Sequence, residues 1–175
     1  MNLNVILPIK KITIDGIEIS LPKLGLKHHN LMKEVKMPDE NLAILLDSIK
    51  PGLDAVQSDI VLLQLLAFNG KIKEEVEKDG FTYRLSDVYG CRILTHRLNG
   101  QEYKFNAPER FSKFGSADTI LDKYFSSVDG RTEKPDFMKL PAFVIKWVDG
   151  IVNTVAIPGP NGPIKGIGNI IRLFE

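Results

Sequence analysis

Residues 59–71, DIVLLQLLAFNGK, would be apolar on nearly every side of an α-helix. A helix that is hydrophobic all round has no face to offer to water and is typical of a protein interior. We therefore predict that this helix lies at the centre of the core. Asp54 or Ser58 is the expected N-cap, because both side chains can accept hydrogen bonds from the free N–H groups of a first turn.

The N-terminal part predicts β structure. Residues 10–21, KKITIDGIEISL, alternate isoleucine or leucine with polar residues on both sides of Asp15-Gly16. An Asp-Gly pair between alternating runs favours a tight turn with positive φ, so we expect a β-hairpin here. Asn4–Leu7 is a candidate third strand, which Pro8 would confine to an edge or a strand end.

A second helix is expected after Pro38. Proline, Asp39 and Glu40 suit a first helical turn, where the N–H groups are unpaired and the helix dipole favours negative charge. One apolar stripe follows, and Lys50-Pro51-Gly52 ends it. The stripe consists of Leu42, Leu45, Leu46 and Ile49.

Two interpretations remain for residues 86–105. In the first, Ser86 caps a helix over residues 87–98 that ends at Asn99-Gly100 in a left-handed conformation. In the second, Asn99-Gly100 turns a β-hairpin between RILTHRL and QEYKF. We favour the helix, because the Ser-Asp start and the Asn-Gly stop have a suitable separation.

A polar break divides the chain near residue 130. SADTILDKYFSS, residues 116–127, predicts a short helix capped by Ser116, and the polar segment VDGRTEKPD follows it. We predict an α+β core domain over residues 1–130 and a helical extension over residues 131–175. The fold class is α+β, with an N-terminal β-hairpin or small sheet packed on a helical core and an amphipathic helical C-terminal extension.

The C-terminal region carries the predicted partner-binding residues. PAFVIKWVDGIVNTVAIP predicts an amphipathic helix of roughly 16 residues between Pro141 and Pro158, short of the ~20 that a membrane span needs. PGPNGP interrupts it, and apolar residues then recur at helical spacing up to Phe174. One interpretation is a hinge that presents a docking segment, and the other is a tail folded onto its own domain. The predicted partner-binding residues are Phe143, Trp147, Ile151, Ile164, Ile167, Ile170, Ile171 and Phe174.

Charge and composition exclude several classes. The chain has 23 basic and 22 acidic residues, a balance that gives no electrostatic footprint for nucleic acid. Its one cysteine, Cys91, allows neither an internal disulfide nor a cysteine-rich zinc site. The N-terminus lacks the order of charges that a secretory signal has, so we expect the protein to work where it is made.

Candidate catalytic groups do not form a recognisable motif. His28-His29 lack the carboxylate spacing of zinc proteases, and we interpret them as surface histidines. Lys165 precedes Gly166 with no hydroxyl after it, so the C-terminal glycines do not form a phosphate loop. The charged run at residues 71–80 is interpreted as a solvent-facing segment ending at Gly80. We therefore predict no cofactor, no metal and no catalytic residue.

Three stretches resemble a known family. MNLNVILPIKKITIDGIEISLPKLGLKHHNLMKEVK, MPDENLAILLDSIKPG and FTYRLSDVYGCRIL are similar to the small baseplate-hub proteins of T-even-like, contractile-tailed bacteriophages. The hub distal subunit is the nearer resemblance and the related hub-assembly protein the second. The resemblance covers most of the first 130 residues. It implies a virion or assembly role at the tail hub inside the infected cell, and it supplies no catalytic residues.

Three functional hypotheses follow. The first is a structural or assembly, chaperone-like protein that binds other phage baseplate hub proteins in the host cytoplasm or the virion tail. Self-association into a homo-oligomer is compatible with it. The second is a peripheral protein that contacts the host inner membrane through residues 143–174, although Lys146 and Lys165 give it a weakly basic face. The third is a small hydrolase using Asp87, Cys91 and His96.

Overall fold

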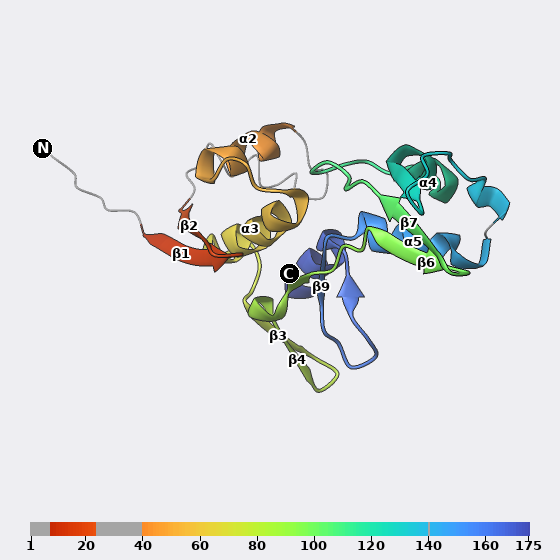
Figure 1. Ribbon diagram of the computed structural model, residues 1–175. Coiled ribbons are helices and arrows are strands. Elements are labelled where there is room, and N and C mark those ends of the chain that lie inside the picture. Colours follow the sequence, from red (N-terminus) through yellow and green to blue (C-terminus); the bar gives the residue numbers. More distant parts are fainter. Residues whose placement is uncertain (1–7, 24–39, 140) are drawn as a thin grey trace, which may run out of the picture.

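The computed structural model describes residues 8–23, 40–139 and 141–175. Helices and short antiparallel sheets alternate along the chain, which confirms the α+β prediction. Two hydrophobic clusters form the core. The first includes the helix predicted to be central, and the second is formed by α4, α5 and the strands β6, β7 and β8. Helices α4 and α5 and strands β6 and β7 lie together on the right of Figure 1.

The N-terminal hairpin is confirmed. Strands β1 (Ile9–Ile14) and β2 (Ile17–Pro22) pair antiparallel, and Asp15 and Gly16 turn between them with φ of 49° and 77°. Two consecutive positive φ angles match the twist of a tight hairpin, which explains the Asp-Gly pair. Ile19 and Leu21 are buried in the first cluster. The candidate strand Asn4–Leu7 lies outside the described residues.

The two predicted N-terminal helices are present. They are α2 (Glu40–Ile49) and α3 (Ala55–Phe68). Asp54 is the N-cap of α3: its carboxylate accepts from the Gln57 backbone N–H at 2.8 Å, while the Gln57 side chain accepts from the Asp54 N–H at 3.1 Å. This capping box satisfies two otherwise unpaired donors, and α3 is buried along most of its length.

Residues 71–84 contain a hairpin that the sequence interpretation missed. Strands β3 (Glu75–Lys78) and β4 (Phe81–Arg84) pair across Asp79-Gly80, whose φ angles are 52° and 77°. The charged run is exposed over most of β3, as expected. Its backbone nevertheless forms strand β3, which pairs with β4. Tyr83 of β4 is buried in the first cluster, so the hairpin is attached to the core.

The helix favoured over residues 87–98 is wrong, and the alternative hairpin is present. A 3₁₀ turn (Leu85–Asp87) leads into β5 (Tyr89–Gly90), and β6 (Thr95–Leu98) pairs with β7 (Gln101–Phe105) across Asn99-Gly100. Alternate side chains of β6 and β7 enter the second cluster at Leu98, Tyr103 and Phe105. Asn-Gly is equally suited to a helix end and to a hairpin turn. The burial of one face of the sheet therefore determines which of the two forms.

The second cluster is completed by α4 and α5. Helix α4 (Ala117–Tyr124) begins after Ser116, as predicted, and leads directly into β8 (Phe125–Val128), which pairs with β7. A 3₁₀ turn (Phe137–Lys139) precedes α5 (Pro141–Val152). Trp147 and Ile151 of α5 are buried against α4 and the β6–β7–β8 sheet.

The C-terminal segment is a short hairpin followed by a helix. Strand β9 (Val155–Ile157) pairs with β10 (Ile164–Lys165) on one side and with β5 on the other, and α6 (Ile167–Phe174) ends the chain. The predicted helices were therefore too long: Val155 and Ile164 lie on strands. The Pro-Gly segment between them forms a turn, in which the Gly162 N–H donates to the Gly159 carbonyl at 3.2 Å.

Residues of the predicted extension contribute to both clusters. Trp147 and Ile151 belong to the second, whereas Val155, Ile157 and four residues of α6 belong to the first. The division at residue 130 stays a prediction. What the structure does establish is that the chain passes from one cluster to the other between Val152 and Val155, across Asn153 and Thr154.

Candidate functional site: a cleft between the two clusters

Two adjoining cavities lie between the clusters. One, of about 430 Å³, is bordered by α3, the end of α5, the start of α6 and the loop before α4. The other, of about 480 Å³, is bordered by the α3 N-terminus and the residues after β7. Ala55, Arg92 and Glu109 line both. We call the two together the cleft.

Asp59 and Thr154 form a buried polar pair at the cleft. The Thr154 hydroxyl donates a hydrogen bond to the Asp59 carboxylate, joining α3 to the two residues that connect α5 with β9. Each residue is 7% exposed. Burial raises the pKa of Asp59 to about 6, although the Thr154 hydrogen bond and the Arg92 charge both act to lower it.

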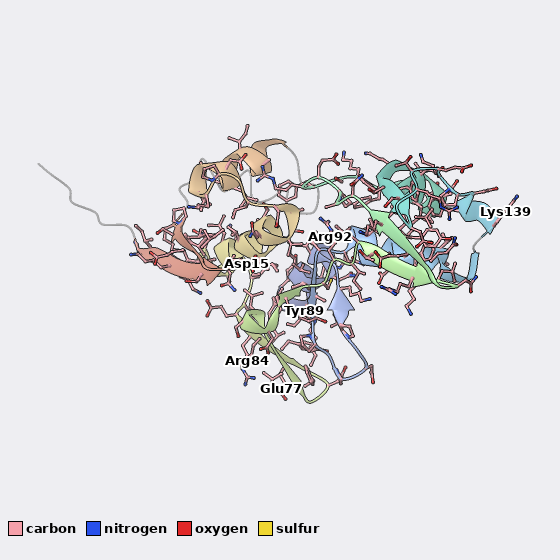
Figure 2. The ribbon with its side chains drawn as sticks, viewed as in Figure 1. Asp15, Glu77, Arg84, Tyr89, Arg92 and Lys139 are labelled. Atoms are coloured by element: carbon pink, nitrogen blue, oxygen red, sulfur yellow. The ribbon has the colours of Figure 1, made fainter. Side chains whose placement is uncertain are left out.

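Arg92 lines both cavities, and Figure 2 labels it near the middle of the view. Its Nη1 donates to the Pro108 carbonyl at 3.5 Å, and burial lowers the pKa of its guanidinium against the attraction of the Asp59 and Asp54 carboxylates. Its Nε–H is buried with no hydrogen-bond acceptor in the described part of the chain. Burying a donor without an acceptor costs free energy, so the burial of this N–H disfavours the observed position of the side chain.

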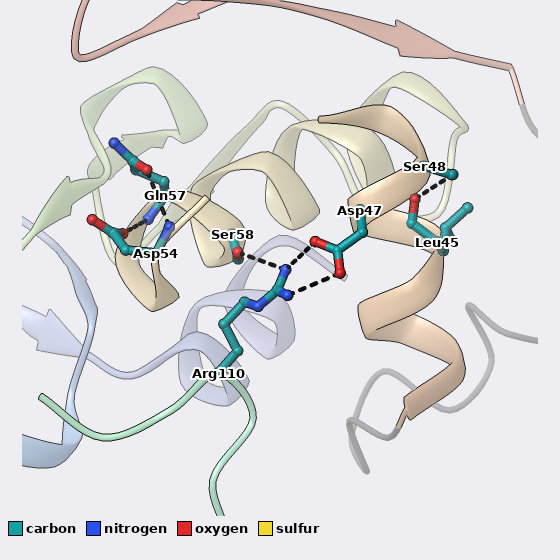
Figure 3. A network of polar contacts seen from close by, with 7 residues as sticks. All are labelled: Leu45, Asp47, Ser48, Asp54, Gln57, Ser58 and Arg110. Atoms are coloured by element: carbon teal, nitrogen blue, oxygen red, sulfur yellow. Dashed lines mark hydrogen bonds and ion pairs between the residues drawn. The ribbon is translucent and has the colours of Figure 1, made fainter. Parts of the chain in front are cut away.

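Arg110 attaches the loop after β7 to the helices of the first cluster (Figure 3). Its Nη1 and Nη2 donate to the two carboxylate oxygens of Asp47 at 2.9 and 3.1 Å, and Nη1 lies 3.5 Å from the Ser58 hydroxyl. This two-pronged geometry is the strong form of an ion pair. It holds the pKa of Asp47 below its usual value.

The segment after β5 runs across the cleft in extended form. The Cys91 N–H donates to the Thr154 carbonyl at 2.9 Å, and the Ile93 N–H donates to the Gly150 carbonyl at 2.6 Å. The Cys91 thiol lies 3.7 Å from the Asn153 carbonyl, and burial raises its pKa. The same segment then becomes β6, so it belongs to both halves of the molecule.

Most of the predicted partner-binding residues are buried within this chain. Ile164 and Ile167 are partly exposed, and the side chain of Phe143 lies outside what the structure describes. The other five residues anchor α5 and α6 in the core, as expected of a tail folded onto its own domain. A partner would reach them only after those helices moved. They are Trp147, Ile151, Ile170, Ile171 and Phe174.

Other apolar side chains, which the sequence interpretation missed, are exposed. Ile145 on α5 is 79% exposed and Ile93 is 53% exposed. Ile93 lies beside α5, since a Cβ on Gly150 would stand 3.3 Å from the Ile93 Cβ. The signal for Ile145 was present, because it is an isoleucine on the side of the helix that carries Lys146 and Asp149. Asp59 and Thr154 gave no comparable signal, because they are 95 residues apart.

The three hydrolase candidates make contacts in different places. Asp87 is exposed in a 3₁₀ turn, and the Cys91 thiol faces the Asn153 carbonyl. The His96 ring packs on Trp147 and Phe105, with ring centres 5.5 and 5.8 Å apart, and burial lowers its pKa. The pair His28-His29 lies outside the described residues. Across residues 8–23, 40–139 and 141–175, no three His, Cys, Asp or Glu side chains gather as metal ligands would.

Among the described helices, none combines the length and the apolar character needed to cross a bilayer. Lys165, one of the two lysines expected on the polar face, forms an ion pair with Asp149 at 2.7 Å.

Fold and cleft together define a small α+β protein whose polar groups join its own segments to one another. Comparison with known proteins identifies its family. A family model described as "Baseplate hub distal subunit" matches residues 21–174, and the "Baseplate hub assembly protein gp28" of Enterobacteria phage T4 is 50% identical over 177 residues, covering 100% of both chains. No solved structure matches the chain.

The chain belongs to the family of baseplate hub distal subunits of phage tails. The resemblance stated from the sequence is confirmed, and with it a structural or assembly role in the baseplate hub. Its place is the tail baseplate, and its partners are other baseplate proteins.

Proposed function

We propose that this chain acts in the hub without catalysing a reaction, and that it binds a neighbouring hub protein through the exposed side of α5. We define the α5 surface as the exposed side of α5 that carries Ile145. The observation that carries the proposal is the 79% exposure of Ile145 on a helix whose opposite side is fixed by Trp147 and Ile151, which are 2% and 0% exposed. A rigid helix with an exposed aliphatic side chain is a suitable anchor for a protein partner.

The predicted partner-binding residues take two roles in this proposal. Ile164 and Ile167 are partly exposed and are candidates for direct contact. The buried residues of α5 and α6 hold those elements in place. Binding takes place in the host cytoplasm while the hub is built, and the chain then stays in the baseplate.

The α5 surface can be tested by recovery of partners. We would compare the intact chain, Ile145→Asp and the control Ile44→Asp as baits in a lysate of phage-infected cells. Ile44 lies on α2 and is 66% exposed, so both substitutions place a charge in water. We expect the intact chain and Ile44→Asp to recover baseplate proteins identified by mass spectrometry, and Ile145→Asp to lose them. Equal recovery by Ile145→Asp, with a normal melting temperature, would refute the α5 surface.

Catalysis and membrane contact have separate tests. A phage lacking this gene product should form plaques when supplied with an Asp87→Asn, Cys91→Ser double variant, because neither side chain holds the core together. Failure of that variant, with its folding intact, would revive the hydrolase hypothesis. Flotation of the purified chain with anionic liposomes would instead support the peripheral membrane alternative.

A further inference from the structure

The two hydrophobic clusters are packed as separate bodies. Among the described residues they share no buried member, and each has its own sheet and helices. Short segments connect them: the extended run from β5 to β6, the loop from β7 to α4, and Asn153-Thr154. Such short connections at the boundary of two packed bodies are where hinge motion is concentrated.

Hydrogen bonds are described at the junction of the two bodies. The Thr154 hydroxyl, in one connecting segment, reaches Asp59 on α3, and the Cys91 N–H, in another, reaches the Thr154 carbonyl. In the loop after β7, Arg110 reaches Asp47 and Phe111 packs against the first cluster. Beside them lie the two cavities of about 430 and 480 Å³. Close apolar packing would resist rotation of one body on the other, whereas a few hydrogen bonds next to open volume resist it much less.

Two groups at the junction would gain from contact with water. The Asp59 carboxyl is 7% exposed in the closed cleft, and the Arg92 Nε–H is buried without an acceptor in the described residues. Opening the cleft would hydrate both, and the Asp59–Thr154 hydrogen bond opposes that opening. The Asp59–Thr154 hydrogen bond is therefore one of the contacts that hold the closed position, together with the Arg110–Asp47 pair.

We propose that the junction is a hinge and that the hydrogen bond from Thr154 to Asp59, beside Arg92, is its latch. When the latch breaks, the two clusters rotate apart with their packing intact and the cleft opens. The device goes beyond partner binding by the α5 surface and does not depend on it. A hub protein with this hinge has a closed and an open conformation, which differ in the angle between the two clusters.

Cys91 supplies a reporter at the joint. It is the only cysteine of the chain, its backbone N–H is bonded to Thr154, and its thiol is partly buried against Asn153. The test is the rate at which dithiobis(nitrobenzoate) reacts with the native full-length chain. Thr154→Val removes the hydroxyl and keeps the shape. We expect the thiol to react about tenfold faster, because the loss of one buried hydrogen bond shifts the equilibrium between closed and open states by about that factor.

Three control variants separate latch opening from general loss of stability. Thr154→Ser keeps a hydroxyl and should restore the slow reaction. Thr13→Val makes the same change on the exposed side of β1 and should leave the rate unchanged. Ile120→Val weakens the second cluster at a residue 5% exposed, away from the latch, and should lower the melting temperature without a comparable rise in the rate.

The readings that support or overturn the latch are distinct. A faster reaction of Thr154→Val, with unchanged Trp147 fluorescence and circular dichroism, supports it, because the clusters then stay packed while the joint opens. An unchanged rate overturns it, as does an equal acceleration by Ile120→Val. Hydrogen exchange of the Cys91 and Ile93 amides gives a second readout, and both should exchange faster in Thr154→Val only.

Discussion

Arg110 and Asp47 are 63 residues apart in sequence, and the guanidinium of one donates to both carboxylate oxygens of the other at 2.9 and 3.1 Å. The pair fastens the loop between β7 and α4, which otherwise belongs to the second cluster, to α2 beside the first (Figure 3). It is therefore a second tie between the two bodies, and Arg110 borders one cavity while Asp59 and Thr154 border the other.

Arg110→Ala should free this loop without unfolding the protein. We expect faster tryptic cleavage after Lys113 and a small change in melting temperature, because partly exposed ion pairs contribute little to global stability. Arg97→Ala is the control, since it breaks another pair, Arg97–Glu102 at 3.0 Å, on the β6–β7 hairpin. Equal cleavage of the loop in both variants would contradict this role for Arg110.

The Arg110–Asp47 tie also has a defined pH dependence. Because Arg110 holds the pKa of Asp47 below its usual value, the pair is present at pH above the unfolded pKa and is lost as pH falls through the lower folded pKa. The difference in cleavage rate between Arg110→Ala and the intact chain should therefore vanish in acid, measured with a protease active at low pH.

Asp59→Asn should flatten the dependence of stability on pH. The folded pKa of Asp59 is raised from 3.8 to about 6. Its protonated form therefore contributes stability that is fully present below the unfolded pKa and is lost as pH rises through about 6. A shift of this size corresponds to roughly 3 kcal/mol between the two limits. Urea unfolding at pH 4.5 and pH 8 measures the difference, and we expect the intact chain to lose more stability than the variant.

A matched variant isolates this effect. Asp122 is exposed on α4, so Asp122→Asn makes the same chemical change in water and should keep the pH dependence of the intact chain. If Asp59→Asn followed the same curve as Asp122→Asn, Asp59 would be ionised at no cost and its burial would not set its pKa.

Gly90→Ala should destabilise the contact between β5 and α3. A Cβ at Gly90 would stand 2.7 Å from the Val56 Cγ1, closer than real atoms approach. Either the strand or the first turn of α3 has to move, at a cost of about 1–3 kcal/mol for an overpacked site. Gly115→Ala is the control, because a Cβ there meets nothing within 4 Å. Chemical unfolding of both variants gives the comparison, and equal stabilities would contradict the close approach.

The sequence identified those elements for which one local signal dominates. The Asp15-Gly16 turn and the capped, largely apolar α3 each allowed a single interpretation, and both are present. Residues 87–98 had two, since Asn99-Gly100 suits a helix end and a hairpin turn equally. The decision came from Leu98 and Tyr103, which enter the second cluster from adjacent strands. That cluster is assembled from segments far apart in the sequence. The periodicity of a short stretch therefore carries no information about it.

The cleft could not be predicted from the sequence for a related reason. Asp59 stands at the start of an apolar run, where a carboxylate is typical of a helix start, and Thr154 lies inside the helix predicted between Pro141 and Pro158. Only the return of the chain along β9 brings them together. The partner-binding list shows the converse. Its residues were recognised as two apolar stripes, one on each side of PGPNGP, but an apolar stripe is equally compatible with a core and with a partner.

Phe174→Ala distinguishes those two roles for the C-terminal segment. Phe174 is 0% exposed in the first cluster, and its carbonyl accepts from the Lys73 N–H at 2.8 Å. As a core residue it should cost about 3–5 kcal/mol of unfolding free energy when truncated. Gly168→Ala on the same helix, where a Cβ meets nothing within 4 Å, should instead stabilise by about 0.5–1 kcal/mol. A Phe174→Ala chain that kept its full stability and lost only its hub partners would make α6 a docking helix.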